Sequence, residues 1–336
     1  MTMILQTKTK MKVNFTQVWY FTLSAYLDLG SCTYFIFILV LNMYVLIIGC
    51  NVVLIVVICM NRSLHEPMYM FLCSLFVNEL YGSTGLFPFL LIQILSDVHT
   101  VSAPLCFLQV FCLYSYGSVE FLTLAVMSYD RYVAICFPLQ YNTVMTSKKT
   151  VRLVVIMWFY PFFSIAILLS LSVGLPLCGN IINKIYCHNS SIMKLSCFNV
   201  TFNNVYGIVN AFFLLFFPAV LIFYTYISII KVCFSGSKQT RQKAVSTCTP
   251  HLVSLLNFSF GSFLEVLESR LNMSSFPNML QVVGQSSLVY IISCQTLFNP
   301  LLYGLKMTKI RRKLDLCLIK TETMFKCNRV SYIEIV

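Results

Sequence analysis

Residues 34–59 read YFIFILVLNMYVLIIGCNVVLIVVIC, a stretch that contains no charged side chain. In a lipid bilayer every backbone N–H and C=O group has to be satisfied within the protein, so a run of this kind can cross only as a helix. Its length suits one crossing, which takes roughly 20–25 residues. The stretch therefore predicts a first membrane helix.

Further apolar stretches follow along the chain, and together they predict seven spans at 34–59, 67–95, 104–136, 151–173, 205–233, 242–267 and 280–304. The composition agrees, because 58% of the 336 residues are hydrophobic and only 10% are charged, whereas about 25% of a soluble domain is charged. An ordinary soluble enzyme and a disordered chain are both excluded. We predict an all-α membrane protein, with a seven-helix domain over 34–304 between an N-terminal segment, 1–33, and a tail, 305–336.

Positive charge is unevenly placed between these spans. Most Lys and Arg residues fall in the segments after the first, third, fifth and seventh spans, and such segments are cytoplasmic by the positive-inside rule. The N-terminus is therefore expected outside the cell, in a multi-pass protein of the plasma membrane. The basic stretch 306–313 predicts a short amphipathic helix on the cytoplasmic face. The net charge of +12 could suggest a nucleic-acid partner, but in a membrane protein the placement of the charges matters more. The lipid bilayer is therefore the expected partner, and no nucleic acid is expected.

Glycosylation sequons agree with this topology. Those in the predicted outer segments begin at Asn14, Asn189, Asn199 and Asn272, and we expect glycans there. Asn61 and Asn257 also match the pattern, but one is cytoplasmic and the other lies in the bilayer, so we take both as chance matches.

Four cysteines gather on the outer, oxidising side of the predicted bundle. Cys106 lies at the outer end of the third span, and Cys178, Cys187 and Cys197 lie in the loop after the fourth. Four thiols allow three pairings. The residues alone leave these pairings open, with free loop thiols as the alternative.

A few ionisable residues lie at membrane depth, where a charge is costly. Glu79 and Glu120 are midway along the second and third spans, and Asp130-Arg131 lies near the inner end of the third. Pro300 interrupts the last span. The pattern suits a conformational switch, but the two glutamates suit protonated, hydrogen-bonded packing residues equally well.

Several motifs resemble those of the odorant (olfactory) receptors, a family of rhodopsin-like G-protein-coupled receptors. They are MSYDRYVAIC at 127–136 with Pro138, Leu139 and Tyr141 after it, KAVSTCTPHL at 243–252, LHEPMY at 64–69, Asn51, and Asn299-Pro300-x-x-Tyr303. The overall sequence, including Leu23-Ser24-Ala25-Tyr26, is most similar to the aquatic-vertebrate branch of this family. Two departures stand out: Glu79 replaces the usual Asp, and the FYG of the sixth helix reads FSFG at 258–261.

The resemblance implies a receptor that binds a small-molecule odorant inside the bundle and activates a heterotrimeric G protein of the stimulatory type, raising cyclic AMP. The ligand-binding residues it implies are Tyr114, Gly117, Ser118, Phe121, Tyr206, Asn210, Ala211, Ser262, Glu265 and Val266. The coupling and switch residues are Asp130, Arg131, Tyr132, Tyr226, Lys243, Asn299, Pro300 and Tyr303. The implied disulfides are Cys106–Cys187 and Cys178–Cys197.

Related receptors bind sodium at the depth of Glu79 and Glu120, so this pair is expected to hold either a sodium ion or a shared proton, with no other cofactor. The alternatives are a rhodopsin-like receptor for a non-odorant small ligand, and an ion channel or transporter. The channel and transporter are disfavoured by the span count and by the absence of internal repeats. The four histidines form no metal-spaced pair and no nucleophile or phosphate motif is present, so no enzyme is expected.

Overall fold

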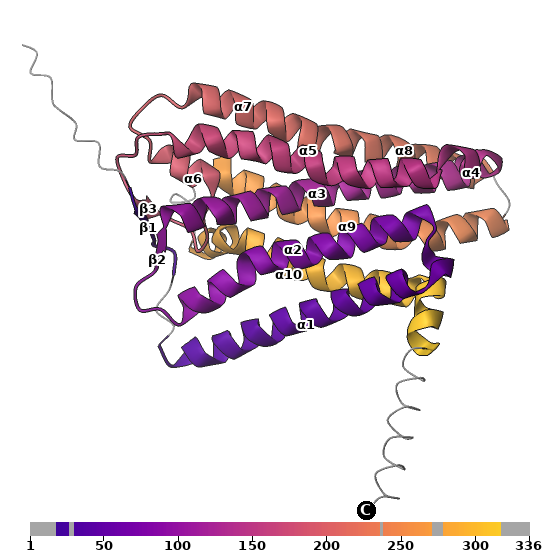
Figure 1. Ribbon diagram of the computed structural model, residues 1–336, viewed down its shortest axis with the longest axis horizontal. Coiled ribbons are helices and arrows are strands. Elements are labelled where there is room, and N and C mark those ends of the chain that lie inside the picture. The colour runs from indigo at the N-terminus through magenta and orange to yellow at the C-terminus, as the bar shows by residue number, and fades with distance from the viewer. Residues whose placement is uncertain (1–17, 27–29, 236–237, 271–277, 317–336) are drawn as a thin grey trace, which may run out of the picture.

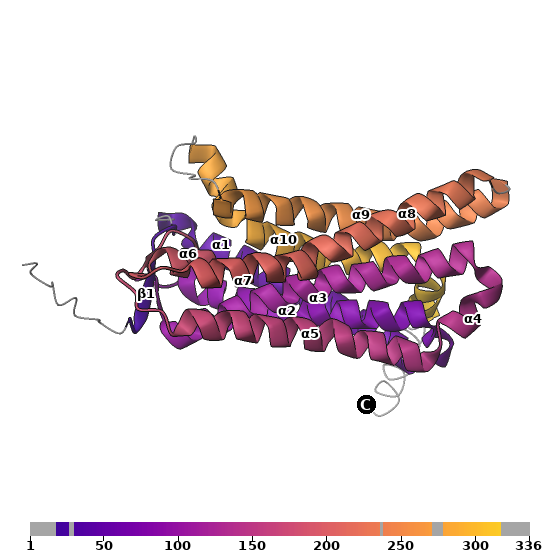
Figure 2. The ribbon, with the colours of Figure 1, turned by 90° about the horizontal axis from the view of Figure 1, so that it is seen from above.

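The computed structural model of the chain describes residues 18–26, 30–235, 238–270 and 278–316, and in this part seven long helices lie side by side (Figures 1 and 2). They are α1 (Thr33–Met60), α2 (Pro67–Ile94), α3 (Ala103–Cys136), α5 (Ser147–Val173), the continuous run of α7 (Thr201–Ala211), η4 (Phe212–Phe216) and α8 (Phe217–Ser235), α9 (Lys238–Arg270) and α10 (Asn278–Lys306). The predicted seven-helix membrane bundle is confirmed, and each span lies where an apolar stretch predicted it.

Helix starts follow the local sequence. Pro67 occupies the first turn of α2, where a missing N–H costs nothing. Thr146 precedes α5, and its hydroxyl accepts a hydrogen bond from the backbone N–H of Lys149 at 3.4 Å. Within α7–η4–α8, the residues of η4 form a π-helical turn, which shifts the facing of the side chains before it relative to those after it.

Six of these helices, counted over the described residues, are long and apolar enough to cross a bilayer. The other long helix, α9, is charged at both ends but packs along α10 and against α3 and α8 as a member of the bundle. Large apolar side chains cover the outside of the bundle, for example Phe35, Val45, Phe159 and Phe223, each at least half exposed. Such a surface suits lipid and not water.

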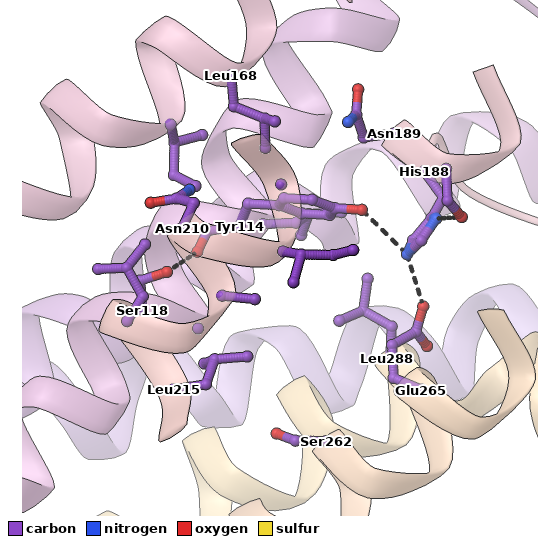
Figure 3. Close-up of a pocket in the computed structure, with 18 of the residues that line it drawn as sticks. Tyr114, Ser118, Leu168, His188, Asn189, Asn210, Leu215, Ser262, Glu265 and Leu288 are labelled. Carbon is purple, nitrogen blue, oxygen red and sulfur yellow. Dashed lines mark hydrogen bonds and ion pairs between the residues drawn. The ribbon is translucent and has the colours of Figure 1, made fainter. Parts of the chain in front are cut away.

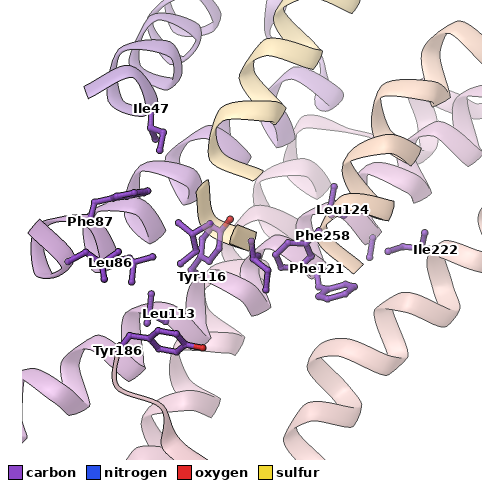
Figure 4. Close-up of a cluster of buried hydrophobic side chains, with 14 of the residues drawn as sticks. Ile47, Leu86, Phe87, Leu113, Tyr116, Phe121, Leu124, Tyr186, Ile222 and Phe258 are labelled. Carbon is purple, nitrogen blue, oxygen red and sulfur yellow. The ribbon is translucent and has the colours of Figure 1, made fainter. Parts of the chain in front are cut away.

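The interior of the bundle is filled by aromatic and aliphatic side chains (Figure 4). Phe258 of α9 lies edge-on to Phe121 of α3, with ring centroids 4.9 Å apart, and edge-on to Tyr116 at 6.5 Å. All three rings are buried. They link α3 to α9 at mid-depth.

A small sheet caps one end of the bundle (Figure 1), and the sequence analysis did not predict it. Its central strand β1 (Tyr20–Leu23) pairs antiparallel with β2 (Thr100–Ser102) and parallel with β3 (Ile181–Ile182). Phe21 and Leu23 of β1 are buried against the bundle. The N-terminal segment is thus tied to the loop before α3 and to the loop after α5.

The opposite end carries the predicted short helix. Residues 308–316 are helical after a break at Met307 and turn away from α10 (Figure 1). Ile310 is buried against the bundle, and Lys309 Nζ lies 2.6 Å from the Glu66 carboxylate at the start of α2. Both partners are more than half exposed, so this pair contributes little to stability.

Candidate functional site

A cavity of about 460 Å³ opens in the half of the bundle nearest the sheet (Figure 3). Side chains from α3, α5, α7, α9 and α10 line it, together with the loop around α6 (Asn189–Lys194). Its size is in the range of small-molecule sites, and its walls are mainly aliphatic and aromatic with polar groups at a few positions.

Eight of the ten predicted ligand-binding residues line this cavity: Tyr114, Gly117, Ser118, Phe121, Asn210, Ala211, Ser262 and Glu265. The first four form one stripe of α3, as the helical period predicts. The side chain of Val266 lies outside the described residues.

The prediction for Tyr206 is wrong. The cavity-facing stripe of α7 contains Asn203, Gly207, Asn210 and Ala211. Tyr206 lies off this stripe, and its hydroxyl donates a hydrogen bond to the Ser164 carbonyl of α5 at 3.2 Å.

The structure adds loop residues that the sequence analysis missed, above all His188, Asn189, Ser190 and Met193. The structure forms disulfides Cys106–Cys187 and Cys178–Cys197, the two pairs that the resemblance implies. The first bridge ties the loop to the top of α3, and the Cys187 N–H also donates to Gln109 Oε1 at 2.9 Å. The residue after the bridged loop cysteine is therefore held over the cavity, which is the signal that would have identified His188.

The burial of Asn189 corrects one of the four glycosylation predictions. Asn189 is 4% exposed and its amide donates to Met193 Sδ, so the folded chain has no room for a glycan there. Asn199 is exposed, and its Oδ1 accepts from the Thr201 N–H of its own sequon at 2.8 Å. Asn14 and Asn272 lie outside the described residues.

The outer end of the cavity is closed by a buried polar cluster. Glu265 of α9 accepts hydrogen bonds from Lys184 at 2.8 Å, from the Tyr186 hydroxyl at 2.9 Å and from the Ser287 hydroxyl. His188 Nε2 lies 3.1 Å from the same carboxylate. This cluster connects the loop to α9 and α10.

The N-terminal segment supports this loop from outside. The Tyr26 hydroxyl donates to the Ile185 carbonyl at 2.8 Å, and its ring stacks on His99 with centroids 4.3 Å apart. Burial raises the pKa of the Tyr26 phenol, which therefore keeps its proton and its role as donor. The loop that covers the cavity is thus held in three ways: by the pairing of β1 with β3, by the Tyr26 hydrogen bond and by the Cys106–Cys187 disulfide.

At mid-depth the two buried glutamates are brought together. Asn299 Nδ2 donates to Glu79 Oε1 at 2.5 Å and to Glu120 Oε1 at 3.2 Å. The Tyr116 hydroxyl donates to Glu79 Oε2 at 3.2 Å, and Asn78 donates to Glu120 Oε2 at 3.0 Å. Both glutamates are fully buried. The last helix is therefore hydrogen-bonded to α2 and α3 through these two carboxyl groups.

Residues predicted to act in coupling lie at the far end of the bundle. Arg131 Nη2 lies 2.5 Å from Asp130 Oδ2, and the Tyr141 hydroxyl donates to Asp130 Oδ1 at 2.8 Å. The Tyr226 hydroxyl hydrogen-bonds His251 Nδ1, with both side chains buried. His251 belongs to the KAVSTCTPHL motif but was not singled out from the sequence.

The remaining switch residues are placed as follows. Tyr132 is half-buried and lies edge-on to Phe137. Pro300 lies inside α10, and Tyr303 is buried with its ring edge-on to Phe76. The side chain of Lys243 lies outside the described residues.

Comparison with known proteins decides the family. A family model described as olfactory receptor matches residues 40–321, which is most of the chain. The chain belongs to the olfactory receptor family. Human olfactory receptor 10J4 is 33% identical over 279 residues, covering 82% of this chain and 87% of that protein. Human olfactory receptor 11H4 is 35% identical over 274 residues, covering 81% and 83%.

A solved structure confirms the receptor fold. The crystal structure of squid rhodopsin matches with a TM-score of 0.67 at 17% identity, over 87% of this chain and 82% of rhodopsin. The predicted family is thus confirmed, and the chain is a multi-pass membrane receptor rather than an enzyme. Membership also favours a receptor over the channel or transporter that the sequence left as an alternative.

Proposed function

We propose that this receptor binds a small-molecule odorant in the cavity and then activates a heterotrimeric G protein of the stimulatory type, which raises cyclic AMP. The observation that carries the proposal is the cavity itself. It lies in one half of an olfactory receptor bundle, is lined mainly by apolar side chains, and is closed off from the Asp130–Arg131 pair by the packed core. A volume of about 460 Å³ suits a volatile molecule held by apolar contacts and a few hydrogen bonds.

Activation is proposed to act through Arg131. In the described state its guanidinium is engaged by Asp130, whose other oxygen is occupied by Tyr141. Ligand binding would favour a state in which Arg131 leaves Asp130 and turns toward Tyr226 and the G protein. Tyr226 has to release His251 in the same step. Tyr132, Lys243, Pro300 and Tyr303 are proposed to support this change at the same end of the bundle.

The mid-depth glutamates are proposed to need one positive charge between them. Two carboxylates that share one Asn299 amide cannot both stay ionised in a buried site without a cation. A sodium ion would be held by carboxylate oxygens of Glu79 and Glu120, which both approach the Asn299 side chain, and by the Asn299 oxygen if that side chain turned over. A shared proton satisfies the same geometry without that rotation.

Sodium and proton are distinguished by ion replacement. A bound sodium ion is proposed to stabilise the resting state. Replacing extracellular Na⁺ with a large organic cation should then raise basal cyclic AMP in the parent receptor. Glu120→Gln removes one of the two carboxylates, so its basal cyclic AMP should not respond to the replacement. If a proton is shared, basal output of the parent follows pH and ignores the sodium concentration.

The main experiment is an odorant-panel screen with a cyclic-AMP reporter, in cells with and without the stimulatory Gα subunit. The best agonist should act only in cells that contain the subunit. Alanine substitution at Tyr114, Ser118 or Asn210 should weaken its response while surface expression is unchanged. An unchanged response in all three variants would refute the proposed cavity. Membrane current that rises without cyclic AMP would favour the channel alternative.

The orientation and the branch are also proposals. We propose an extracellular N-terminus with glycans on Asn14, Asn199 and Asn272, and a place in the aquatic-vertebrate branch. An antibody to an N-terminal epitope should label intact cells, and glycosidase treatment should increase the mobility of the protein on a gel. A phylogeny that includes fish and amphibian receptors tests the branch.

A further inference from the structure

One imidazole nitrogen at the outer end of the cavity faces two oxygen atoms. His188 Nε2 lies 3.1 Å from the Tyr114 hydroxyl oxygen and 3.1 Å from Glu265 Oε1 (Figure 3). The other ring nitrogen, Nδ1, lies 2.8 Å from the Ser190 hydroxyl. A ring nitrogen either carries a proton or accepts one. Whether Nε2 carries a proton therefore decides whether the Tyr114 hydroxyl accepts a hydrogen bond from His188 or donates one to it.

The partners of Glu265 show that it is a carboxylate. Lys184 donates to its Oε1, the Tyr186 hydroxyl donates to both of its oxygens, and the Ser287 hydroxyl donates to Oε2. Lys184 brings a positive charge and is itself 3% exposed. A carboxyl group surrounded by donors and paired with a buried cation is stabilised as the anion.

The carboxylate fixes the proton on His188. A bare Nε2 lone pair turned toward an anionic oxygen at 3.1 Å would be repulsive, so Nε2 carries hydrogen and donates to Glu265. Nδ1 then accepts from Ser190, which leaves both ring nitrogens satisfied.

Because Nε2 lies 3.1 Å from both oxygens, its hydrogen is shared between Glu265 and Tyr114, and the Tyr114 oxygen acts as an acceptor toward it. The backbone amides of Asn189 and Ser190 also interact with this oxygen. Within the described residues the Tyr114 hydroxyl has no hydrogen-bond acceptor other than the His188 nitrogen, and that nitrogen is already protonated. Tyr114 lines the cavity, so its own proton is left for a bound molecule.

We propose that the receptor is selective for carbonyl compounds (aldehydes, ketones and esters), whose C=O oxygen accepts a hydrogen bond from the Tyr114 hydroxyl. This rests on the proposed function and names its ligand class. The apolar body of the ligand lies against Phe121, Leu168, Leu215 and Phe258, all on the cavity wall. Amines gain no ion pair, because Glu265 is already neutralised by Lys184.

The test compares methyl ketones with alkenes in which =CH₂ replaces the carbonyl oxygen, so that shape is kept and only the acceptor is lost. Cyclic-AMP concentration–response curves and thermal stabilisation of the purified receptor are measured with the same pairs. In the parent receptor the ketone should be about tenfold more potent than its alkene, which corresponds to about 1.4 kcal/mol. Tyr114→Phe should abolish this ratio.

Two variants sharpen the assignment. Tyr81→Phe is the matched control, because this half-buried phenol bonds Ser115 away from the cavity, and it should keep the ketone preference. His188→Phe should also keep the preference, since the phenol and not the imidazole is the donor. A preference lost in His188→Phe but kept in Tyr114→Phe would overturn the assignment.

The remaining outcomes separate this inference from the proposed function. Equal potency of ketones and alkenes in the parent, or stronger binding of amines, would overturn the ligand class while leaving an odorant receptor. Ketone-selective stabilisation of the purified receptor without any cyclic-AMP response would support the ligand class and refute the proposed signalling.

Discussion

Gly82 of α2 offers a direct test of the packing between α2 and α3. A Cβ atom at this position would lie 2.3 Å from Tyr116 Cδ2, 2.5 Å from Cγ and 2.8 Å from Cε2. Carbon atoms in contact normally stay about 3.5–4.0 Å apart, so the ring would have to retreat by about 1 Å or more. Tyr116 is 1% exposed, lies edge-on to Phe258 and donates a hydrogen bond to Glu79, so a shift of its ring disturbs both of these contacts.

Gly82→Ala should therefore destabilise the receptor. Overpacking costs about 1–3 kcal/mol, and the better helix propensity of alanine returns up to about 1 kcal/mol. A net loss of about 1–2 kcal/mol corresponds to a melting temperature lowered by about 2–8 °C, at roughly 2–4 °C per kcal/mol.

The assay is thermal unfolding of the detergent-solubilised receptor. Gly49→Ala in α1 is the matched control, because nothing lies within 4 Å of a Cβ there, and it should melt at or slightly above the parent temperature. If Gly82→Ala melted as late as Gly49→Ala, the close contact with Tyr116 would be refuted.

Three further substitutions test other parts of the structure. Arg131→Ala should abolish odorant-evoked cyclic AMP at normal surface expression, and preserved signalling would contradict its switch role. Cys106→Ser should cause the receptor to be retained inside the cell, because it removes a disulfide that stabilises the fold by about 2–4 kcal/mol. Cys112→Ser is the control: it removes a free thiol of the same helix, and this variant should reach the cell surface normally. Tyr206→Phe should leave agonist potency unchanged, since this hydroxyl bonds Ser164 outside the cavity, and a large loss of potency would restore Tyr206 to the site.

The spans could be predicted from sequence because lipid imposes one strong constraint on every crossing: the whole segment has to be apolar and helical. The stripe on α3 was also predictable, because Tyr114, Gly117, Ser118 and Phe121 follow the helical period in an uninterrupted helix. These features depend on local sequence alone.

The predictions that failed or were missed concern features that depend on contacts between distant parts of the chain. The rotation of α7 is fixed by contacts with α5, in which Asn203 donates to the Leu171 carbonyl and Tyr206 to the Ser164 carbonyl, and no local pattern specifies them. The strands of the outer sheet are two to four residues long, too short for periodicity to detect. His188 and Asn189 follow the loop cysteine of the Cys106–Cys187 bridge, so this pairing was the one signal that could have identified His188, whereas the sheet that supports the same loop gave no signal in the sequence.

The outer sheet also dictates an order of assembly. Thr22 pairs with Thr100 on one side and with Ile181 on the other, so the first strand to be synthesised waits for partners that follow much later. With the proposed extracellular N-terminus, β1 enters the lumen of the endoplasmic reticulum, where β2 follows only after two membrane helices and β3 only after four. Such contacts, distant in sequence, form slowly, and an unpaired apolar strand edge invites aggregation meanwhile. Delivery of this receptor to the cell surface is therefore expected to be limited by how long nascent chains survive with that strand unprotected.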